Sequence, residues 1–388
     1  MIPLCVPAVG PDEERALAEV LASGWLTEGP KNQEFEQIFA KTVGVEHAVS
    51  LNSCTSALFL ALKAHDIRGE VIIPSFTFVA TANAVVTAGA TPVFADIEPE
   101  SCNLAVADIA RRITPRTEAI LPIHFGGQCC DMAGILELAR RHHLVVIEDS
   151  AETLGGTFND VHAGAFGTGC FSFFPTKNIT TGEGGMLTTN DAGIAHTVRT
   201  LAAHGISRST AERERQRRPW VRSAQFAGYN FRLSSLLAAL GVVQMQKLAS
   251  LNEARRRNAD ALSAQLQGIE GITLPKELPL RRHVYQMYTI QLADLPRDTF
   301  VERLRDRGVG ASVHFTPPVH LQDFYRDPCG SEHLELPQTE AVAARIVTLP
   351  MYPQLTSAQI ATIAETVATC AAELRADPVE TRCEEVLT

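Results

Sequence analysis

A lysine in the middle of the chain lies between a short apolar segment and a glycine-rich turn. The segment reads Phe171-Ser172-Phe173-Phe174-Pro175-Thr176-Lys177, and Gly182-Glu183-Gly184-Gly185 follows shortly after it. A lysine amine can form a Schiff base with a carbonyl carbon and can carry a proton in the same reaction. The flanking pattern predicts that the side chain of Lys177 is held in one place.

A carboxylate follows another apolar segment. Residues 144–147 are all aliphatic, and Glu148 and Asp149 come directly after them. Open α/β folds bind ligands at the carboxyl ends of their parallel strands. A buried Asp149 at such an end needs a cationic partner, since an unpaired buried charge is costly.

Hydroxyl residues follow a third apolar segment, in the order Leu51-Asn52-Ser53-Cys54-Thr55-Ser56-Ala57-Leu58. A strand that runs into the start of a helix in this way offers free N–H groups and the positive end of the helix dipole to a phosphate. The same residues would also serve as an ordinary helix N-cap, and the pattern alone leaves that alternative open.

Together these three features match the requirements of pyridoxal 5'-phosphate. The cofactor needs a cradle for its phosphate, a carboxylate opposite its pyridine nitrogen and a lysine amine for its aldehyde carbon. A carboxylate keeps the pyridine nitrogen protonated, so that the ring can accept electrons when a bound amino acid loses its α-proton. The sequence therefore predicts a pyridoxal-phosphate site.

Short apolar segments recur through the first half of the chain and alternate with helical patterns. Their hydrophobicity is continuous, which is typical of strands buried on both faces of a parallel sheet. This predicts an α/β fold. A long helical stretch over 236–262, a strand over 288–292 and helices over 298–307 and 357–374 follow. We expect a large domain over 1–247 and a smaller C-terminal α+β domain over 248–388. Examples of the predicted strands are residues 47–51, 70–73, 91–94, 119–123, 144–147 and 185–188.

Charge and composition exclude some partners. The formal net charge of −10 over 388 residues argues against a nucleic-acid-binding protein. The one basic run, residues 208–222, is either a solvated loop or a clamp for an anionic substrate.

The chain lacks a secretory signal and a membrane-spanning segment, and nine scattered cysteines fit reduced thiols, so we expect a cytoplasmic protein.

Several other residues are interpreted as structural. Cys129 and Cys130 lack a partner at metal-ligand spacing and are expected to pack in the core, and no metal site is predicted. His142 and His143 are expected at the end of a helix.

At the level of whole motifs, the sequence resembles the DegT/DnrJ/EryC1/StrS family of sugar aminotransferases, a branch of the fold-type I pyridoxal-phosphate enzymes. The resemblance extends over nearly the whole chain. Besides the lysine motif, it rests on Ser23-Gly24-Trp25-Leu26-Thr27-Glu28-Gly29-Pro30, Pro74-Ser75-Phe76-Thr77-Phe78-Val79-Ala80-Thr81-Ala82-Asn83, Gly89-Ala90-Thr91-Pro92-Val93-Phe94-Ala95-Asp96, Gly228-Tyr229-Asn230-Phe231-Arg232, Ser312-Val313-His314-Phe315 and Leu349-Pro350-Met351-Tyr352-Pro353.

The resemblance implies a role for each matching residue. Lys177 is the Schiff-base lysine and proton shuttle, Asp149 is the partner of the pyridine nitrogen, and Phe78 stacks on the cofactor ring. Asn230 would reach the phosphate of the neighbouring subunit, which implies a homodimer with shared active sites. His314 and His320 flank Pro317-Pro318 in a segment that approaches the site, and one of them is expected to contact substrate. The phosphate would be bound by Thr55, by the backbone around Ser53 and Cys54, and by Ser172.

Three positions depart from the family pattern. Glu152 stands where many members carry His or Gln near the 3-hydroxyl of the cofactor, although some amino-sugar synthases read Glu. A second carboxylate beside the ring would change the number of protons that the site holds, and its own pKa would be expected to shift. Cys54 replaces a frequent Gly, which is neutral if only its N–H is used, and Phe174 replaces a frequent His.

The resemblance implies a transaminase that moves an amino group from an amino acid, L-glutamate, to a keto-sugar that is nucleotide-linked. Three alternatives stay open: a sugar dehydratase of the same family, a keto-cyclitol aminotransferase, and a non-enzymatic regulator on this scaffold. The dehydratase branch carries His in place of the lysine, so Lys177 counts against it. A regulator would be expected to lose Lys177 or Asp149, and both are present.

Overall fold

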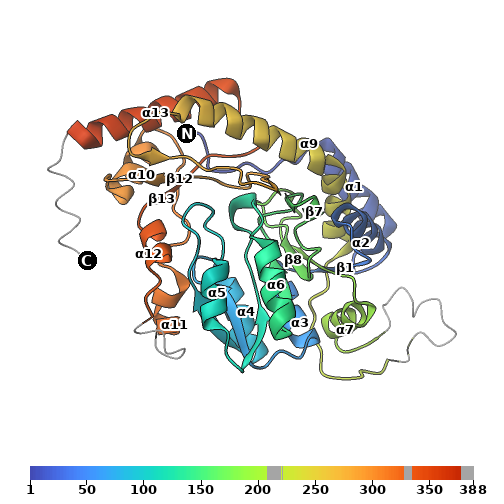
Figure 1. Ribbon diagram of the computed structural model, residues 1–388. Coiled ribbons are helices and arrows are strands. Elements are labelled where there is room, and N and C mark those ends of the chain that lie inside the picture. The colour runs from blue at the N-terminus through green and yellow to red at the C-terminus, as the bar shows by residue number, and fades with distance from the viewer. Residues whose placement is uncertain (208–219, 221, 327–333, 377–388) are drawn as a thin grey trace.

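A computed structural model describes residues 1–207, 220, 222–326 and 334–376 (Figure 1). Apart from Trp220 and Arg222, the basic run at 208–222 lies outside these residues. The two interpretations of that run, a solvated loop or an anion clamp, therefore stay predictions.

The centre of the molecule is a seven-stranded sheet in which six strands run in one direction and only β9 is antiparallel. This confirms the predicted α/β fold with a mainly parallel sheet. Because the other strands share a direction, their carboxyl ends lie at one edge of the sheet. The strand order is β1 (His47–Leu51), β9 (Gly185–Thr189), β8 (Thr168–Ser172), β5 (Val145–Asp149), β4 (Thr117–Ile120), β2 (Glu70–Pro74) and β3 (Thr91–Ala95).

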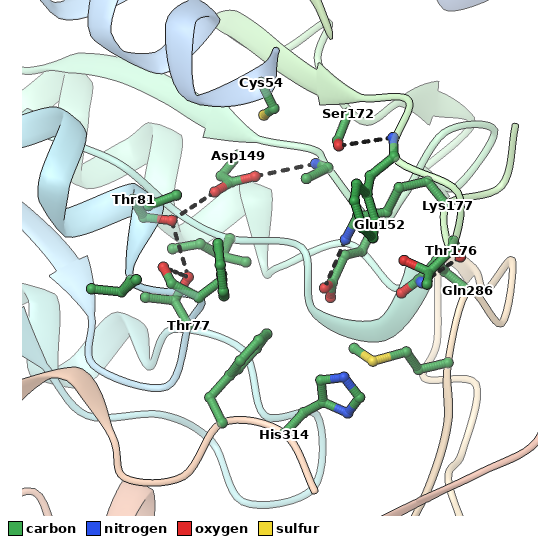
Figure 2. Close-up of a pocket in the computed structure, with 18 of the residues that line it drawn as sticks. Cys54, Thr77, Thr81, Asp149, Glu152, Ser172, Thr176, Lys177, Gln286 and His314 are labelled. Carbon is green, nitrogen blue, oxygen red and sulfur yellow. Dashed lines mark hydrogen bonds and ion pairs between the residues drawn. The ribbon is translucent and has the colours of Figure 1, made fainter. Parts of the chain in front are cut away.

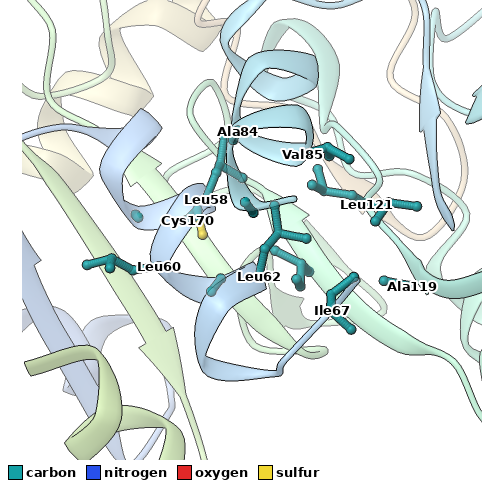
Figure 3. Packing of buried hydrophobic residues seen from close by; sticks show 14 of the residues in the cluster. Leu58, Leu60, Leu62, Ile67, Ala84, Val85, Ala119, Leu121 and Cys170 are labelled. Carbon is teal, nitrogen blue, oxygen red and sulfur yellow. The ribbon is translucent and has the colours of Figure 1, made fainter. Parts of the chain in front are cut away.

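Helices bury both faces of this sheet. Within β2, Val71 and Ile73 pack into one cluster, whereas Ile72 between them packs into a cluster on the opposite face. Alternate side chains of an apolar strand are thus both buried, which explains the continuous hydrophobicity of the sequence. Figure 3 shows the first cluster, where Leu58 and Leu62 lie beside Val85 and Leu121.

The helices divide between the two faces. The first face is covered by α3 (Cys54–Ala64), α4 (Ala80–Ala88) and α7 (Ala192–Ala202). The opposite face is covered by α5 (Val106–Arg112), α6 (Met132–His142), α2 (Pro30–Val43) and α9 (Ser235–Leu266), with α1 (Pro11–Ser23) packed against α9.

A second hydrophobic cluster, called the small core here, is built on a three-stranded sheet (Figure 1). Its strands are β10 (Ile272–Thr273), β12 (Tyr288–Leu292) and β13 (Ile346–Leu349), and its helices are α10 (Arg297–Asp306) and α13 (Ser357–Ala376). Thr356 caps α13, because its hydroxyl accepts a hydrogen bond from the Gln359 N–H at 3.2 Å. Ile2, Cys5 and Val6 pack against this cluster although they come from the opposite end of the chain.

One helix belongs to both cores. Leu248 of α9 packs with the large-domain cluster around α2, and Ala259, farther along the same helix, packs in the small core. The helix is continuous over 32 residues. The predicted boundary between residues 247 and 248 therefore falls inside α9, and the division into two domains stays a prediction.

Short elements complete the described part of the chain. They are the 3-10 helices η1 (Phe125–Gly127) and η2 (Val319–Leu321), the strands β6 (Thr157–Phe158), β7 (Val161–His162) and β11 (Arg281–Arg282), and the helices α11 (Asp323–Arg326) and α12 (Pro337–Ala343). No helix among the described residues is both long enough and apolar enough to cross a bilayer.

The residues interpreted as structural occupy structural positions. Cys129 and Cys130 are fully buried among the side chains of α5 and α6, and the Cys130 thiol donates to the carbonyl of Ile123 at 3.1 Å. His142 ends α6, and His143 follows with the left-handed φ of 57° that terminates a helix. Both predictions are confirmed.

Candidate active site

The carboxyl ends of β1, β5 and β8 open into one cavity of about 650 Å³. The central sheet contributes these strand ends, and α4 contributes its start. Leu4, Gln286 and Met351 line the opposite wall, from the N-terminal segment and the loops around the small core. Figure 2 shows residues of both walls pointing toward the space between them. A cavity of this size is typical of sites for small molecules.

Lys177 lies in the cavity on the loop that follows β8. Its amine is 3.3 Å from a carboxylate oxygen of Glu152, and the other oxygen of Glu152 accepts a hydrogen bond from the Gly126 N–H at 2.9 Å. Only 17% of the Lys177 side chain is exposed. The amine is therefore held at a defined point, as the sequence pattern predicted.

Asp149 ends β5 and is fixed by two donors. The Thr81 hydroxyl donates to one carboxylate oxygen at 2.8 Å, and the Ala151 N–H donates to the other at 3.2 Å. Because the single hydroxyl proton of Thr81 goes to Asp149, Thr77 is the donor to the Thr81 oxygen 3.0 Å away, and the Phe78 carbonyl at 3.4 Å competes for the same Thr77 proton (Figure 2). Burial raises the pKa of the Asp149 carboxyl above its usual value. The site thus holds a carboxylate that would gain from a cationic partner.

The start of α3 faces the cavity through Ser53, Cys54 and Thr55. The Ser53 hydroxyl caps the helix by accepting from the Ser56 N–H at 3.1 Å. Within the described residues the N–H groups of Cys54 and Thr55 have no acceptor, as expected in the first turn of a helix. Capping and phosphate binding are therefore compatible here, since the cap uses one N–H and leaves two. Burial raises the pKa of the Cys54 thiol well above its usual range.

A glycine lets β9 approach this helix start. A Cβ atom on Gly185 would lie 2.4 Å from the carbonyl carbon of Ser53 and 2.5 Å from the nitrogen of Cys54. Real Cβ contacts are not this short, so any other residue would push β9 away from α3. The close approach fixes the free N–H groups against the sheet, beside Ser172 at the end of β8.

Two aromatic side chains are exposed in the cavity. Phe78 is 64% exposed and Phe174 is 46% exposed, although both line the cavity wall. A large apolar side chain left open inside a cavity is suited to cover the flat face of a ligand. Phe78 stands where the family resemblance places a ring that stacks on the cofactor.

Of the three remaining predicted residues, only His314 lines the cavity of its own chain. His314 lines the cavity, its Nδ1 is 2.8 Å from the Thr348 hydroxyl, and burial lowers its pKa below the usual value. His320 does not line it: the fully buried ring lies between the Ser75 hydroxyl at 2.6 Å and Glu340 at 3.3 Å. Asn230 is exposed outside the cavity of its own chain, and its side-chain oxygen accepts hydrogen bonds from Arg232.

Sequence reasoning missed several residues of the site. Thr77 and Thr81 were part of a matching motif but were not recognised as partners of Asp149. The available signal was their position after β2, at the carboxyl edge of the sheet: Thr77 lies in the loop before α4 and Thr81 in the first turn of α4. Met351 also belonged to a matching motif without being recognised as a site residue, whereas Gln286 carried no signal at all. The packing of the small core against the central sheet brings both residues to the cavity.

The donor set fits pyridoxal 5'-phosphate. Cys54 and Thr55 offer free N–H groups to a phosphate, Asp149 offers an anion to a protonated pyridine nitrogen, and Lys177 offers an amine. All of these residues line one cavity with Phe78. Across the part of the chain that is described, no group of three or more His, Cys, Asp or Glu residues is arranged to hold a metal ion.

Comparisons with known proteins lead to the same family. The model of the DegT/DnrJ/EryC1/StrS aminotransferase family matches residues 7–368. The spore coat polysaccharide biosynthesis protein SpsC of Bacillus subtilis strain 168 is 39% identical over 374 residues, which are 94% of this chain and 96% of SpsC.

Solved structures resemble the whole chain. The aminotransferase TlmJ from Streptoalloteichus hindustanus has a TM-score of 0.90 at 32% identity and covers 97% of this chain and 100% of its own. DesI, solved in the presence of its TDP-sugar product, has a TM-score of 0.87 at 31% identity, with 99% of this chain and 96% of DesI covered. The chain therefore belongs to the DegT/DnrJ/EryC1/StrS aminotransferase family and is a pyridoxal-phosphate-dependent sugar aminotransferase.

Proposed function

We propose that this protein transfers an amino group from L-glutamate to a nucleotide-linked keto-sugar, in the biosynthesis of an amino sugar. One observation carries the proposal: the Lys177 amine, the Asp149 carboxylate and the start of α3 line the same cavity. The choice of donor and acceptor is supported by the family and by the TDP-sugar product of DesI.

Each residue has a task in this proposal. Pyridoxal phosphate supplies an aldehyde carbon that takes the amino group and a ring that accepts electrons. Asp149 holds a proton on the pyridine nitrogen. The Lys177 amine takes the α-proton of the amino acid in the first half-reaction and returns a proton to the sugar carbon in the second. Cys54 and Thr55 bind the phosphate through their N–H groups, with Ser172 beside them.

Glu152 and His314 complete the wall around the amine. The Glu152 carboxylate holds Lys177 at 3.3 Å, so the amine is oriented even before a substrate enters. The lowered pKa of His314 favours a neutral ring, which can donate to or accept from a sugar hydroxyl. We assign substrate binding to His314 and leave His320, whose ring is engaged elsewhere, out of the site.

We further propose that the enzyme is a cytoplasmic homodimer with shared sites. The seven described cysteines are all free thiols, which supports a reducing compartment. Asn230 lies outside the cavity of its own chain, and the family resemblance assigns it to the phosphate of the partner.

The acceptor can be identified directly. Protein carrying pyridoxamine phosphate is mixed with a panel of nucleotide-linked keto-sugars, the same sugars without the nucleotide, and a keto-cyclitol. Return of the pyridoxal form is followed by absorbance, and the aminated product by mass spectrometry. We expect turnover with a nucleotide-linked keto-sugar and none in the Lys177→Ala variant.

The donor is tested by the opposite half-reaction. Protein carrying pyridoxal phosphate is offered single amino acids, and the resulting 2-oxo acid is measured. We expect 2-oxoglutarate from L-glutamate.

In the acceptor experiment, a preference for the cyclitol, or loss of a sugar hydroxyl without amination, would replace the proposed acceptor reaction by one of the alternatives.

A further inference from the structure

The loop that carries Lys177 has an unusual set of backbone contacts. Residues 175–177 of this loop are called the lysine loop here. The lysine loop presents three successive carbonyl groups to side chains from other parts of the chain. The Gln286 amide donates to the carbonyl of Thr176 at 2.9 Å, and the Arg255 guanidinium donates to that of Lys177 at 3.5 Å. The Cys5 thiol lies 4.0 Å from the carbonyl oxygen of Pro175 and 3.9 Å from that of Thr176.

Arg255 is the centre of this arrangement. Only 2% of the residue is exposed, and within the described residues its guanidinium has carbonyl acceptors and no carboxylate partner. It donates to the carbonyl of Met351 at 2.9 Å and to that of Gln286 at 3.3 Å. Its Nε has no acceptor at all among the described residues. Burial lowers the pKa of the group from its usual value.

Such a buried cation is costly for stability. An apolar side chain of similar length would fill the same space without the desolvation penalty of an unpaired charge. What an apolar side chain cannot do is hold several carbonyl groups at fixed angles, which the planar fork of a guanidinium does. The arrangement therefore indicates a positioning task rather than a stabilising one.

The position of Arg255 along α9 shows what it connects. It lies between Leu251, which packs against the large-domain cluster around α2, and Ala259, which packs in the small core. Gln286 directly precedes Met287 and β12, and Met351 follows β13. Three of these residues, Cys5, Gln286 and Met351, also line the cavity. Figure 2 shows Gln286 reaching Thr176 beside Lys177.

We propose that Arg255 and Gln286 are positioning residues that tie the lysine loop to the small core, so that the small core sets where the Lys177 amine points. This inference rests on the proposed role of Lys177 as the reacting amine. A ligand that contacts the small-core wall of the cavity acts on the same loops that hold the lysine backbone. The lysine is thereby placed relative to the acceptor as well as to the cofactor.

The test compares variants that remove these contacts with a matched control. Arg255→Met removes the guanidinium and keeps most of the volume, Arg255→Lys keeps the charge without the fork, and Gln286→Met removes the bond to Thr176. The control is Arg256→Met. Arg256 is the next residue of α9 and binds Glu277 and the carbonyl of His283, and none of these hydrogen bonds or ion pairs reaches the lysine loop.

The first measurement needs no cofactor. Apoprotein is treated with trace acetic anhydride, and the acetylation of Lys177 is compared by mass spectrometry with that of Lys247, a partly exposed lysine paired with Asp12 and Glu13. We expect the ratio to rise by about threefold or more in Arg255→Met and Gln286→Met, because the released amine leaves its defined position. Arg255→Lys should give an intermediate ratio and Arg256→Met the wild-type ratio.

The second measurement uses the loaded protein. The absorbance of the lysine-bound cofactor is titrated with pH, and the steady-state constants are determined. We expect a shifted titration midpoint and a kcat lowered by about tenfold, with KM for the donor changed by less than about twofold. A purely structural role would lower Tm without moving the midpoint or the Lys177 reactivity.

Each result decides between the proposals. Borohydride reduction of the wild-type protein first shows which lysine carries the cofactor; a label on another lysine refutes both the proposed function and this inference. A label on Lys177 together with wild-type reactivity and midpoint in folded Arg255→Met refutes the positioning role alone. If Arg255→Met does not fold, Gln286→Met decides in the same way.

Discussion

At the scale of single residues, Lys177 is the one lysine that lines the cavity among the described residues. Borohydride reduction followed by digestion should therefore place the pyridoxyl label on Lys177, and the purified protein should be yellow before reduction. The measurement is peptide mass spectrometry. A label on any other lysine would show that the site assignment is wrong.

Asp149 should be essential for the chemistry but not for the fold. The Asp149→Asn variant keeps the shape of the side chain and removes the charge that stabilises the protonated pyridine nitrogen. We expect a half-reaction slower by at least about a hundredfold, as is typical when a preorganised charge is lost. Stopped-flow absorbance with L-glutamate measures this rate. A rate close to that of the wild type would show that Asp149 has another role.

The same substitution should stabilise the apoprotein at neutral pH. Burial raises the pKa of the Asp149 carboxyl above that of the unfolded chain, so the folded protein loses stability as pH rises through this window. The amide of Asn carries no such charge, and its nitrogen can still donate to the Thr81 oxygen. We expect the free energy of unfolding of Asp149→Asn to exceed that of the wild type by about 1 kcal/mol at pH 7.

Thermal melts of both apoproteins over a pH series check this expectation. The difference in Tm should grow with rising pH and shrink below the unfolded pKa of about 4. A difference that does not depend on pH would assign the effect to packing instead of charge.

The sequence made the reacting residues of the site recognisable but not their partners. Lys177 and Asp149 stand next to local signals, a glycine-rich turn and the end of an apolar strand. Thr81 acts on Asp149, and Gln286 on Thr176, across long separations in the chain. Such pairs depend on how whole elements pack, and no local pattern contains that information.

At the scale of elements, the glycine of β9 should control cofactor binding. Gly185→Ala places a Cβ atom 2.4 Å from the Ser53 carbonyl carbon, so β9 and the start of α3 must separate. We expect stability to fall by about 1 to 3 kcal/mol and the cofactor to bind at least about tenfold more weakly.

Equilibrium dialysis with pyridoxal phosphate and a denaturant titration measure the two effects. Gly193→Ala serves as the control, because its Cβ would meet only a carboxylate oxygen of Asp191 at 3.1 Å, the end of a side chain. Normal cofactor affinity in folded Gly185→Ala would show that the position of α3 does not matter for the phosphate.

The bounds of a strand were predictable where nearly all of its side chains are apolar or buried and no proline or glycine interrupts the pattern. The strand at His47–Leu51 was predicted with its observed bounds, whereas the strand predicted over 119–123 is observed at Thr117–Ile120. Pro122 has no N–H to continue the ladder, although its apolar neighbours extend the pattern. β8 was missed because Gly169 and Ser172 interrupt its apolar pattern, although it leads into the lysine loop.

At the scale of the whole molecule, the proposed shared site predicts complementation between two inactive variants. Lys177→Ala and Asn230→Asp should each be inactive, the second because its added negative charge repels the phosphate. If Asn230 serves the partner, a hybrid dimer has one site with both defects and one native site. After subunit exchange, activity should rise towards about a quarter of the wild type for random pairing.

The mixing experiment also tests the alternative that Asn230 has only a local structural role. If Asn230 only stabilises its own turn, its loss costs about 1 kcal/mol and leaves cofactor affinity unchanged. A mixture that stays inactive after demonstrated exchange, or an Asn230→Asp protein that is fully active alone, would refute the shared site.

The overall division of the chain was less predictable than its parts. The first residues pack with the small core, where Ile2 forms a bridge with Val309, so that core is built from both ends of the sequence. Nothing near Ile2 in the sequence indicates this contact. A boundary drawn through the sequence at one point therefore misses the contribution of the N-terminal segment.

The pairing of β1 has a consequence for how the protein is made. β1 has a single neighbour in the central sheet, β9, and Leu51 pairs with Gly185. Ribosomes add about 5 to 20 residues per second, so a nascent chain keeps its first strand unpaired for on the order of ten seconds. During that time α3 can pack against α4, β5 and β8 as they appear, but it lacks β9, the strand that approaches its start most closely at Gly185. We therefore expect the free N–H groups at the start of α3 to reach their final position only after synthesis has passed residue 185.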